Sequence, residues 1–403
     1  MFHRIFSYII IPLLLMCTAV VIIAYARGYR LDVVKTAAAI ISYALGYKID
    51  DEPYLNVTGI LAATSDPTGA QIYVDGDFSA ATESNINLAP GTYEVAITKE
   101  GYHEWRRTVD IHGEVATSLF AVLFLKNPSL APLIATTATS PMLSPDGTKL
   151  AYIASPAATL TTGQSLFESS LQRPTLFLYD LSGRTMPFSR NPQPYNGTRA
   201  ALLREWDTET RIKGEKSLAA MPDEFQEIAT DSMRIIQFSP DETRVFYEAT
   251  DSAVLERSIR PALIGDGPKP DERELEKGNF YVYDLREDRN YKITSELGSL
   301  AEDIRVHLQG ADVPGVTSGG ESFSYSPMPL PVFWLGNSQH FVLIENNTIN
   351  IMEYHGGNKV TVYSGPFENG FVFPHPSGGQ LIIMTTLNPE VSPAGSLYTL
   401  NIR

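Results

Sequence analysis

The sequence predicts a mainly β protein, and three observations define its expected parts. Short segments between Ser65 and Ile111 alternate apolar and polar residues and are separated by turn residues. From Ser140 to the C-terminus, a polar turn followed by an apolar strand recurs. Residues 5–26 form an apolar run long enough to span a bilayer as a helix. We therefore expect an N-terminal transmembrane helix, a small β domain and a larger β domain built of repeats.

The apolar run at residues 5–26 carries no charged residue and follows Arg4. We interpret it as an uncleaved signal anchor, so that residues 1–52 form a membrane anchor and a stalk helix. Two alternatives stay open. The segment 24–26 has the small-x-small form of a signal-peptide cleavage site, and Cys17 would be the lipid-modified residue of a lipoprotein signal. Cys17 is the only cysteine, so no disulfide can form within one chain.

Residues 53–126 are expected to form a small antiparallel β domain of about four to six strands. The segments 70–74 and 92–99 alternate apolar and polar side chains, as half-buried strands do. Asp75-Gly76 is a hairpin signal because both central positions of such a turn need a positive φ. Segment 89–91 (Ala-Pro-Gly) is a further turn signal.

Three motifs in this segment keep a fixed order and spacing: Ser65-x-Pro67-x-Gly69-Ala70-x-Ile72-Tyr73-Val74-Asp75-Gly76, Leu88-x-Pro90-Gly91-x-Tyr93-x-Val95, and Lys99-x-Gly101-Tyr102. Together they resemble the PEGA domain. The resemblance implies a β module of the bacterial or archaeal cell envelope, without catalytic or transferable binding residues. One departure is Thr82-Glu83, where the family usually has Thr-Pro, and it predicts a looser turn there.

The charges that flank the apolar run conflict with this module type. Arg4 precedes the run, whereas Arg27, Arg30 and Lys35 follow it, so the positive-inside count favours a cytoplasmic C-terminus. Large domains, however, are translocated largely regardless of flanking charge. We therefore expect a single-pass protein of the cytoplasmic membrane, with the bulk of the chain extracytoplasmic.

Residues 127–139 are rich in Pro, Ala, Ser and Thr, and we expect a linker there. In residues 140–403, a turn-and-strand segment is repeated at 142–154, 237–249, 333–345 and 373–385. A further strand motif follows each copy, at 176–184, 279–288, 348–358 and 396–403. Strand, turn, strand and strand is the order within a propeller blade. This part resembles the TolB-like and WD-repeat-like β-propellers.

The spacing of the repeats leaves the number of blades open. Equivalent positions lie 95, 96 and 40 residues apart, at Leu150, Val245, Phe341 and Leu381. A blade takes about 40–45 residues, so each long gap hides a degenerate blade or holds an insertion. About six blades would fill the segment, although 198–232 and 251–278 look helical or loop-like.

The sequence shows no motif for catalysis or metal binding. We expect Asp146 and Asp241 to cap their own turns by accepting hydrogen bonds from nearby backbone N–H groups. The seven histidines lack metal-ligand spacing, and no nucleophile elbow, phosphate loop or calcium loop occurs. We therefore expect no catalytic residue, no metal and no cofactor. The net charge of −15 disfavours nucleic acid as a partner.

These features predict a non-enzymatic, membrane-anchored cell-envelope protein. Residues 5–26 would hold it in the membrane, the PEGA-like domain would act as a spacer, and the propeller would bind an envelope protein or a cell-wall glycan. The alternative is an envelope enzyme acting on glycans, with two carboxylates about 5–10 Å apart at the propeller mouth. Four aromatic residues form either a sugar-stacking surface or, more commonly, core: Tyr102, Trp105, Phe333 and Trp334.

Overall fold

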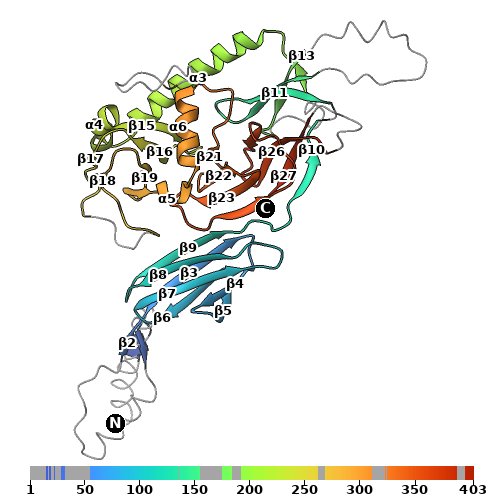
Figure 1. The fold of residues 1–403 in the computed structure, drawn as a ribbon. Coiled ribbons are helices and arrows are strands. Elements are labelled where there is room, and N and C mark those ends of the chain that lie inside the picture. Colours follow the sequence, from blue (N-terminus) through green and yellow to red (C-terminus); the bar gives the residue numbers. More distant parts are fainter. Residues whose placement is uncertain are drawn as a thin grey trace, which may run out of the picture. The chain divides into compact units, whose positions relative to one another are not determined.

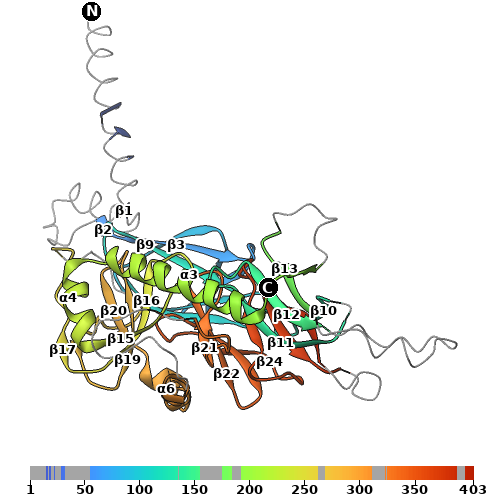
Figure 2. The same cartoon turned by 90° about the horizontal axis from the view of Figure 1, so that it is seen from above.

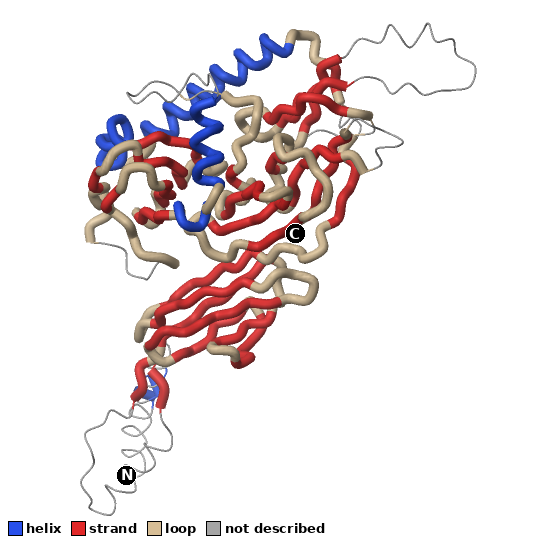
Figure 3. The backbone as a smooth tube through the Cα atoms, viewed as in Figure 1, coloured by secondary structure: helices blue, strands red, loops and turns tan. Residues whose placement is uncertain are grey.

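The structure is a computed structural model of the 403-residue chain. It describes residues 15–16, 18–19, 22, 29–31, 55–134, 136–154, 175–183, 192–261, 268–310, 323, 325–387 and 395–403. Strands dominate both compact units into which the chain divides, Met1–Leu123 and Phe124–Arg403 (Figure 3). We call them the PEGA unit and the blade unit.

The predicted transmembrane helix is corrected by the structure. A span needs about 20 consecutive apolar helical residues. No helix in the described residues is both long enough and apolar enough to cross a membrane. Of residues 5–26, only 15, 16, 18, 19 and 22 are described, and these are helical and exposed. This finding overturns the predicted transmembrane helix and the single-pass location derived from it. Most of residues 5–26 lies outside the described residues, and the membrane as a partner stays a prediction.

The segment expected to be a stalk helix, residues 31–49, is described only at Leu31. That residue ends strand β1 (Tyr29–Leu31), which pairs antiparallel with β2 (Leu55–Val57). The remainder of the expected helix lies outside the described residues.

Besides the β1–β2 pair, the described residues of the PEGA unit form two larger sheets (Figure 1). The three-stranded sheet has the order β6-β3-β9, and the four-stranded sheet has the order β5-β4-β7-β8. Their strands are β3 (Gly59–Asp66), β4 (Gln71–Val74), β5 (Asp77–Ala81), β6 (Ser84–Leu88), β7 (Gly91–Thr98), β8 (Trp105–Ile111) and β9 (Ala116–Val122). One buried cluster joins the two sheets, with Leu61 and Leu119 from the first and Ile72, Ile97 and Trp105 from the second. The alternation is clearest in β3, where every second residue is buried in this shared core.

The sequence predicted an antiparallel domain, but the PEGA unit is not purely antiparallel. Strand β3 pairs with β9 in parallel, from Ile60 opposite Ala116 to Asp66 opposite Val122. A parallel pair needs a long crossover connection, and strands β4 to β8 lie within that connection. Alternation along a strand is the same in both orientations, so the sequence pattern did not reveal the direction of pairing.

The turn at Thr82-Glu83 is held by buried hydrogen bonds and is not loose. The hydroxyl of Thr82 lies 2.6 Å from that of Ser65 and accepts a hydrogen bond from the backbone N–H of Ala70 at 2.9 Å. The N–H of Thr82 donates to the carbonyl of Ala70 at 2.7 Å. Thr82 therefore fastens this turn to strand β3.

The described residues of the blade unit form four four-stranded antiparallel sheets, which we call blades 1 to 4. Blade 1 is β11 (Ala138–Leu143), β12 (Lys149–Ala154), β13 (Thr175–Asp180) and β14 (Gln193–Pro194). Blade 2 is β15 (Met233–Phe238), β16 (Arg244–Ala249), β19 (Phe280–Asp284) and β20 (Arg289–Lys292). Blade 3 is β21 (Val332–Trp334), β22 (His340–Glu345), β23 (Thr348–Glu353) and β24 (Val360–Tyr363). Blade 4 is β25 (Val372–Pro374), β26 (Gln380–Thr385), β27 (Ser396–Asn401) and β10 (Ser129–Pro132).

The described residues thus contain four such blades, where about six were expected. The repeated turn-and-strand segments coincide with the first two strands of each blade, so each of the four repeats corresponds to one described blade. In the described parts of the long gaps lie insertions: helices α3 (Arg199–Ala219), α4 (Asp223–Ser232), α5 (Thr294–Leu297) and α6 (Leu300–Gly310), and the hairpin β17 (Ala253–Val254) with β18 (Glu274–Leu275).

The ring of blades is closed by a strand from the segment expected to be a linker. Strand β10 pairs antiparallel with β27, from Ser129 opposite Asn401 to Pro132 opposite Tyr398. The C-terminal strand β27 is therefore an inner strand of blade 4, between β26 and β10. The composition of residues 127–139 predicted a linker, and the strand that pairs with β10 lies at the other end of the chain.

Figure 2 shows helix α3 running across the blade unit from α4, and the two helices contact the clusters of blades 1 and 2. Leu202 and Trp206 of α3 contact the cluster of blade 1, whereas Phe225 and Ala229 of α4 contact that of blade 2. The hydroxyl of Thr198 caps α3 by accepting from the N–H of Ala201 at 3.2 Å.

Candidate functional site

A cavity of about 400 Å³ lies where the first strands of the four blades meet, and we call it the central cavity. The first strand of each blade contributes at least one large apolar side chain to its wall, among them Leu143 from β11, Phe238 from β15, Phe333 from β21 and Phe373 from β25. The convergence of four first strands on one space is the radial arrangement of a β-propeller.

Helix α3 presents one face to the central cavity. Thr210, Lys213, Gly214 and Ser217 line the wall, and their spacing places them on adjacent turns of the same face. A Cβ atom at Gly214 would lie 2.0 Å from the ring of Phe323. Glycine at this buried helical position therefore lets the helix and the ring approach closely.

Three polar groups of the wall lack a hydrogen-bond partner among the described residues. They are Ser217 Oγ, His307 Nε2 and Trp334 Nε1. The residue Ser217 is 1% exposed and Trp334 is 3% exposed. Buried polar groups are paired in the great majority of cases, so three such atoms on one cavity wall indicate a place for a ligand. Burial lowers the pKa of His307, which keeps its imidazole neutral near pH 7.

Apart from His307, the acidic and basic residues of the described wall are Asp146 and Lys213. Asp146 accepts hydrogen bonds from the Ser144 hydroxyl at 2.6 Å and from the Thr148 hydroxyl at 2.7 Å and N–H at 3.0 Å. Burial raises its pKa, but these hydrogen bonds outweigh that effect and lower it overall. Asp241 has the same contacts with Ser239 and Thr243 in blade 2. The prediction that both acids cap their own turns is confirmed.

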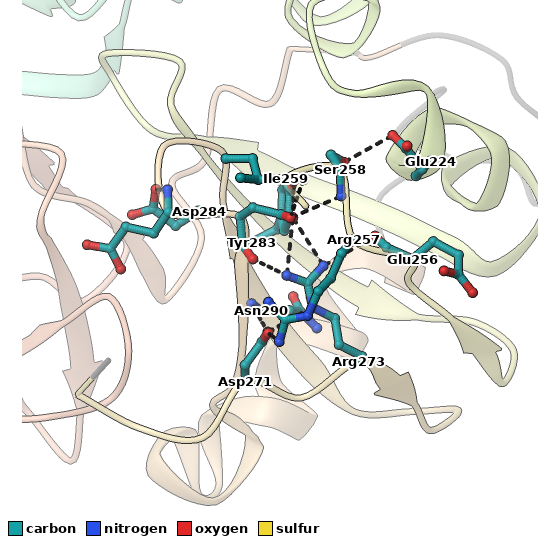
Figure 4. A network of polar contacts seen from close by, with 12 residues as sticks. Glu224, Glu256, Arg257, Ser258, Ile259, Asp271, Arg273, Tyr283, Asp284 and Asn290 are labelled. Atoms are coloured by element: carbon teal, nitrogen blue, oxygen red, sulfur yellow. Dashed lines mark hydrogen bonds and ion pairs between the residues drawn. The ribbon is translucent and has the colours of Figure 1, made fainter. Parts of the chain in front are cut away.

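Figure 4 shows a network of polar and charged contacts that ties an insertion to blade 2. The buried carboxylate of Asp288 accepts from the Tyr283 hydroxyl at 3.0 Å and from the backbone N–H groups of Ser258 and Ile259 at 3.0 and 2.9 Å. The guanidinium of Arg273 contacts it at 3.1 Å. These contacts fasten the insertion that follows β16 to blade 2, and they occupy the oxygens that a catalytic carboxylate would need.

A shallow groove of about 590 Å³ lies on the outer face of the four-stranded sheet of the PEGA unit. It is lined by Tyr73, Asp75, Gly76, Glu94, Ala96, Thr98, Glu104 and Arg106. Arg106 forms ion pairs with Glu94 and, at 2.7 Å, with Glu104. The side chains of Arg106, Glu94 and Glu104 are 59%, 56% and 39% exposed, so this groove is a solvated polar surface.

The four aromatic residues considered as a sugar-stacking surface do not lie together. Trp105 is in the core of the PEGA unit and Tyr102 packs against that core. Phe333 and Trp334 line the central cavity.

Sequence reasoning missed Ser217 and His307, because a serine and a histidine within charged helical segments carry no motif. Among the described residues, no group of three or more His, Cys, Asp or Glu side chains is placed to hold a metal ion.

Residues 58–126 match the family model of the PEGA domain, which confirms that resemblance. No curated protein matches the chain. Three similar solved structures are an Agrobacterium tumefaciens protein assigned as TolB (10% identity, 82% of this chain and 78% of that chain, TM-score 0.19), the Pyrococcus horikoshii acylaminoacyl peptidase (10%, 86% and 39%, 0.18) and the β-propeller domain of Myceliophteria thermophila Cps50 (Swd1) (9%, 87% and 85%, 0.20). The propeller assignment rests on the sheet topology of this chain.

Proposed function

We propose that this chain is a non-enzymatic binding protein. Its central cavity receives the ligand, and its PEGA unit acts as a spacer. The observation that carries this proposal is the composition of the cavity wall. Aromatic and aliphatic side chains from all four blades surround a few polar groups, and the volume of about 400 Å³ falls within the usual range of ligand sites.

The same wall argues against the alternative of a glycan-cleaving enzyme. Glycoside hydrolysis ordinarily needs two carboxyl groups on opposite sides of the scissile bond. Asp146 is the only carboxylate in the described wall, and its oxygens already accept hydrogen bonds from Ser144 and Thr148. The wall is thus equipped to hold a ligand and lacks a general acid and base pair.

The proposal is tested with the immobilised full-length protein exposed to an extract of its native cells. Wild type is compared with Ser217→Phe and Met328→Trp, which narrow the cavity from its buried wall and from its exposed side. Ser252→Phe, at an exposed serine of the blade unit outside the wall, is the matched control. Retained proteins, glycans and small molecules are identified by mass spectrometry, and thermal melting verifies that each variant is folded.

We expect wild type and the control to retain a molecule that both cavity variants lose. Equal retention by all four proteins would show that the cavity is not the binding site. A retained molecule that is converted to product during incubation would show that the protein is an enzyme.

A further inference from the structure

The indole N–H of Trp334 sets the first requirement on a ligand of the central cavity. An indole N–H can donate a hydrogen bond but cannot accept one. This group is buried on the cavity wall and has no acceptor among the described residues. A ligand that satisfies it must bring an acceptor oxygen or nitrogen into the cavity.

Ser217 and His307 can adapt to the same ligand. A hydroxyl and a neutral imidazole each act as donor or acceptor, and burial keeps His307 neutral near pH 7. Neither Ser217 Oγ nor His307 Nε2 is paired within the described part of the chain. Together with the Trp334 indole, they give the cavity one group that can only donate a hydrogen bond and two groups that can donate or accept one.

The rest of the wall limits the charge and polarity of the ligand. Phe238, Leu308, Phe323, Phe333 and Phe373 give it a predominantly apolar surface. Lys213 and Asp146 carry opposite charges, so the described wall has no net charge to balance an ionic ligand. A glycan has many hydroxyl groups that each need a partner when buried, and three free polar groups do not supply them.

Resting on the proposed function, we propose that the central cavity binds a small, uncharged, apolar molecule that carries one carbonyl-type acceptor. The acceptor lies against Trp334 and Ser217, and the apolar body packs among the aromatic and aliphatic side chains of the four blades. Met328 lines the cavity and is 47% exposed, so the ligand enters on its side.

A matched pair of probes tests this inference on the full-length protein. Benzophenone has an apolar body and one carbonyl, and diphenylmethane has nearly the same shape without the carbonyl. Affinities are measured by equilibrium dialysis for wild type, Trp334→Phe, Ser217→Ala and Trp206→Phe. Trp206 is a buried tryptophan of the same unit that does not line the cavity, so its variant is the control.

We expect wild type and Trp206→Phe to bind benzophenone about tenfold more tightly than diphenylmethane, as one buried hydrogen bond provides. In Trp334→Phe this ratio should fall to near one, with diphenylmethane binding unchanged. Ser217→Ala, which leaves the indole intact, should lower the ratio in part. Irradiation of bound benzophenone should attach it to cavity residues.

Several outcomes would overturn the inference. Equal binding of the two probes to wild type would mean that the cavity does not require an acceptor. Tighter binding of the anion 4-benzoylbenzoate, of an N-acetylglucosamine tetramer or of a blocked apolar tripeptide would assign another ligand class. These results would refute the ligand class but not the proposed function. The proposed function would be refuted if wild type and the cavity variants retained the same molecules from the cell extract.

Discussion

The guanidinium of Arg244 in blade 2 donates a hydrogen bond from Nη1 to the carbonyl oxygen of Ser338, 3.0 Å away in the turn of blade 3. The hydroxyl of Ser338 in turn accepts from the backbone N–H of Asp241 at 3.0 Å. Arg244 also forms an ion pair with Asp284 at 2.7 Å and lies 4.2 Å from the ring centre of Tyr354. The repeated turns therefore join neighbouring blades as well as successive strands.

Replacement of Arg244 by Met should strongly destabilise the blade unit, because it leaves the buried carboxylate of Asp284 without its cation. Loss of one partner of a buried ion pair costs about 3–5 kcal/mol. The measurement is urea unfolding followed by tryptophan fluorescence. Arg286→Met is the control, because Arg286 is exposed where it pairs with Asp241, and such pairs contribute about 0–1 kcal/mol. Similar losses in both variants would mean that the buried pair has no special weight.

Gly214→Ala should destabilise the blade unit, although alanine in place of glycine ordinarily stabilises a helix by about 1 kcal/mol. The added methyl group would meet the ring of Phe323 at 2.0 Å, and overpacking of this kind costs about 1–3 kcal/mol. The free energy of unfolding is measured for this variant and for Gly214→Ala with Phe323→Leu. Recovery of stability in the double variant identifies the clash, and a stabilised single variant would contradict the close contact.

Deletion of residues 396–403 should unfold the blade unit and leave the PEGA unit folded. It removes β27 from between β26 and β10, together with Leu397, Leu400 and Ile402, which are fully buried. Each such side chain contributes about 1.5–3 kcal/mol, against a typical total stability of about 5–15 kcal/mol. Calorimetry should show loss of one melting transition and retention of the other. A full melting profile in the deletion variant would contradict closure through β27.

Local patterns predicted those parts of the fold that depend on neighbours in the sequence. The Ser144 and Ser239 turns and their following strands marked the blades, because a turn and a hairpin are specified within a few residues. Pairing across long separations was not predictable in this way. The parallel register of Ile60 with Ala116 and the closure of Ser129 on Asn401 both depend on the completed fold.

The candidate site shows the same limit. Phe333 and Trp334 were noted as aromatic residues, but their meeting with Ser217 of α3 follows from the way the helices pack against the blades. The residue types alone gave no reason to connect positions more than a hundred residues apart. The donor set of the central cavity became visible only when the unpaired atoms were located in three dimensions.

Thr82→Val should destabilise the PEGA unit, because it removes the hydroxyl that bonds Ser65 and the N–H of Ala70. The unpaired Ala70 N–H would remain buried, at a cost of about 1–3 kcal/mol. Thr82→Ser keeps the hydroxyl and should retain most of the stability. Both variants are compared by the melting transition of the PEGA unit. Equal melting of Thr82→Val and wild type would show that the turn does not depend on this hydroxyl.

The stability of the blade unit should fall as the pH is lowered from about 7 to 5, and His307 should account for part of the loss. Burial lowers the pKa of His307 in the folded state, while in the unfolded chain it lies near 6.5. Below that value the unfolded state binds a proton that the folded state still excludes, so acid favours unfolding by up to about 1.4 kcal/mol per pH unit. Burial also lowers the pKa of His375, so one substitution removes only part of the effect.

The measurement for His307 is the free energy of unfolding of wild type and His307→Gln between pH 5 and 8. Glutamine does not titrate in this range, so the variant should show a shallower dependence than wild type. Titration of Asp146 and Asp241 does not contribute to the pH dependence between pH 5 and 8. Their pKa values are lowered by hydrogen bonds that outweigh burial, so they act only below about pH 4. If the two proteins show parallel pH profiles, His307 is not excluded from protonation, and the neutral imidazole assigned to the central cavity would be refuted.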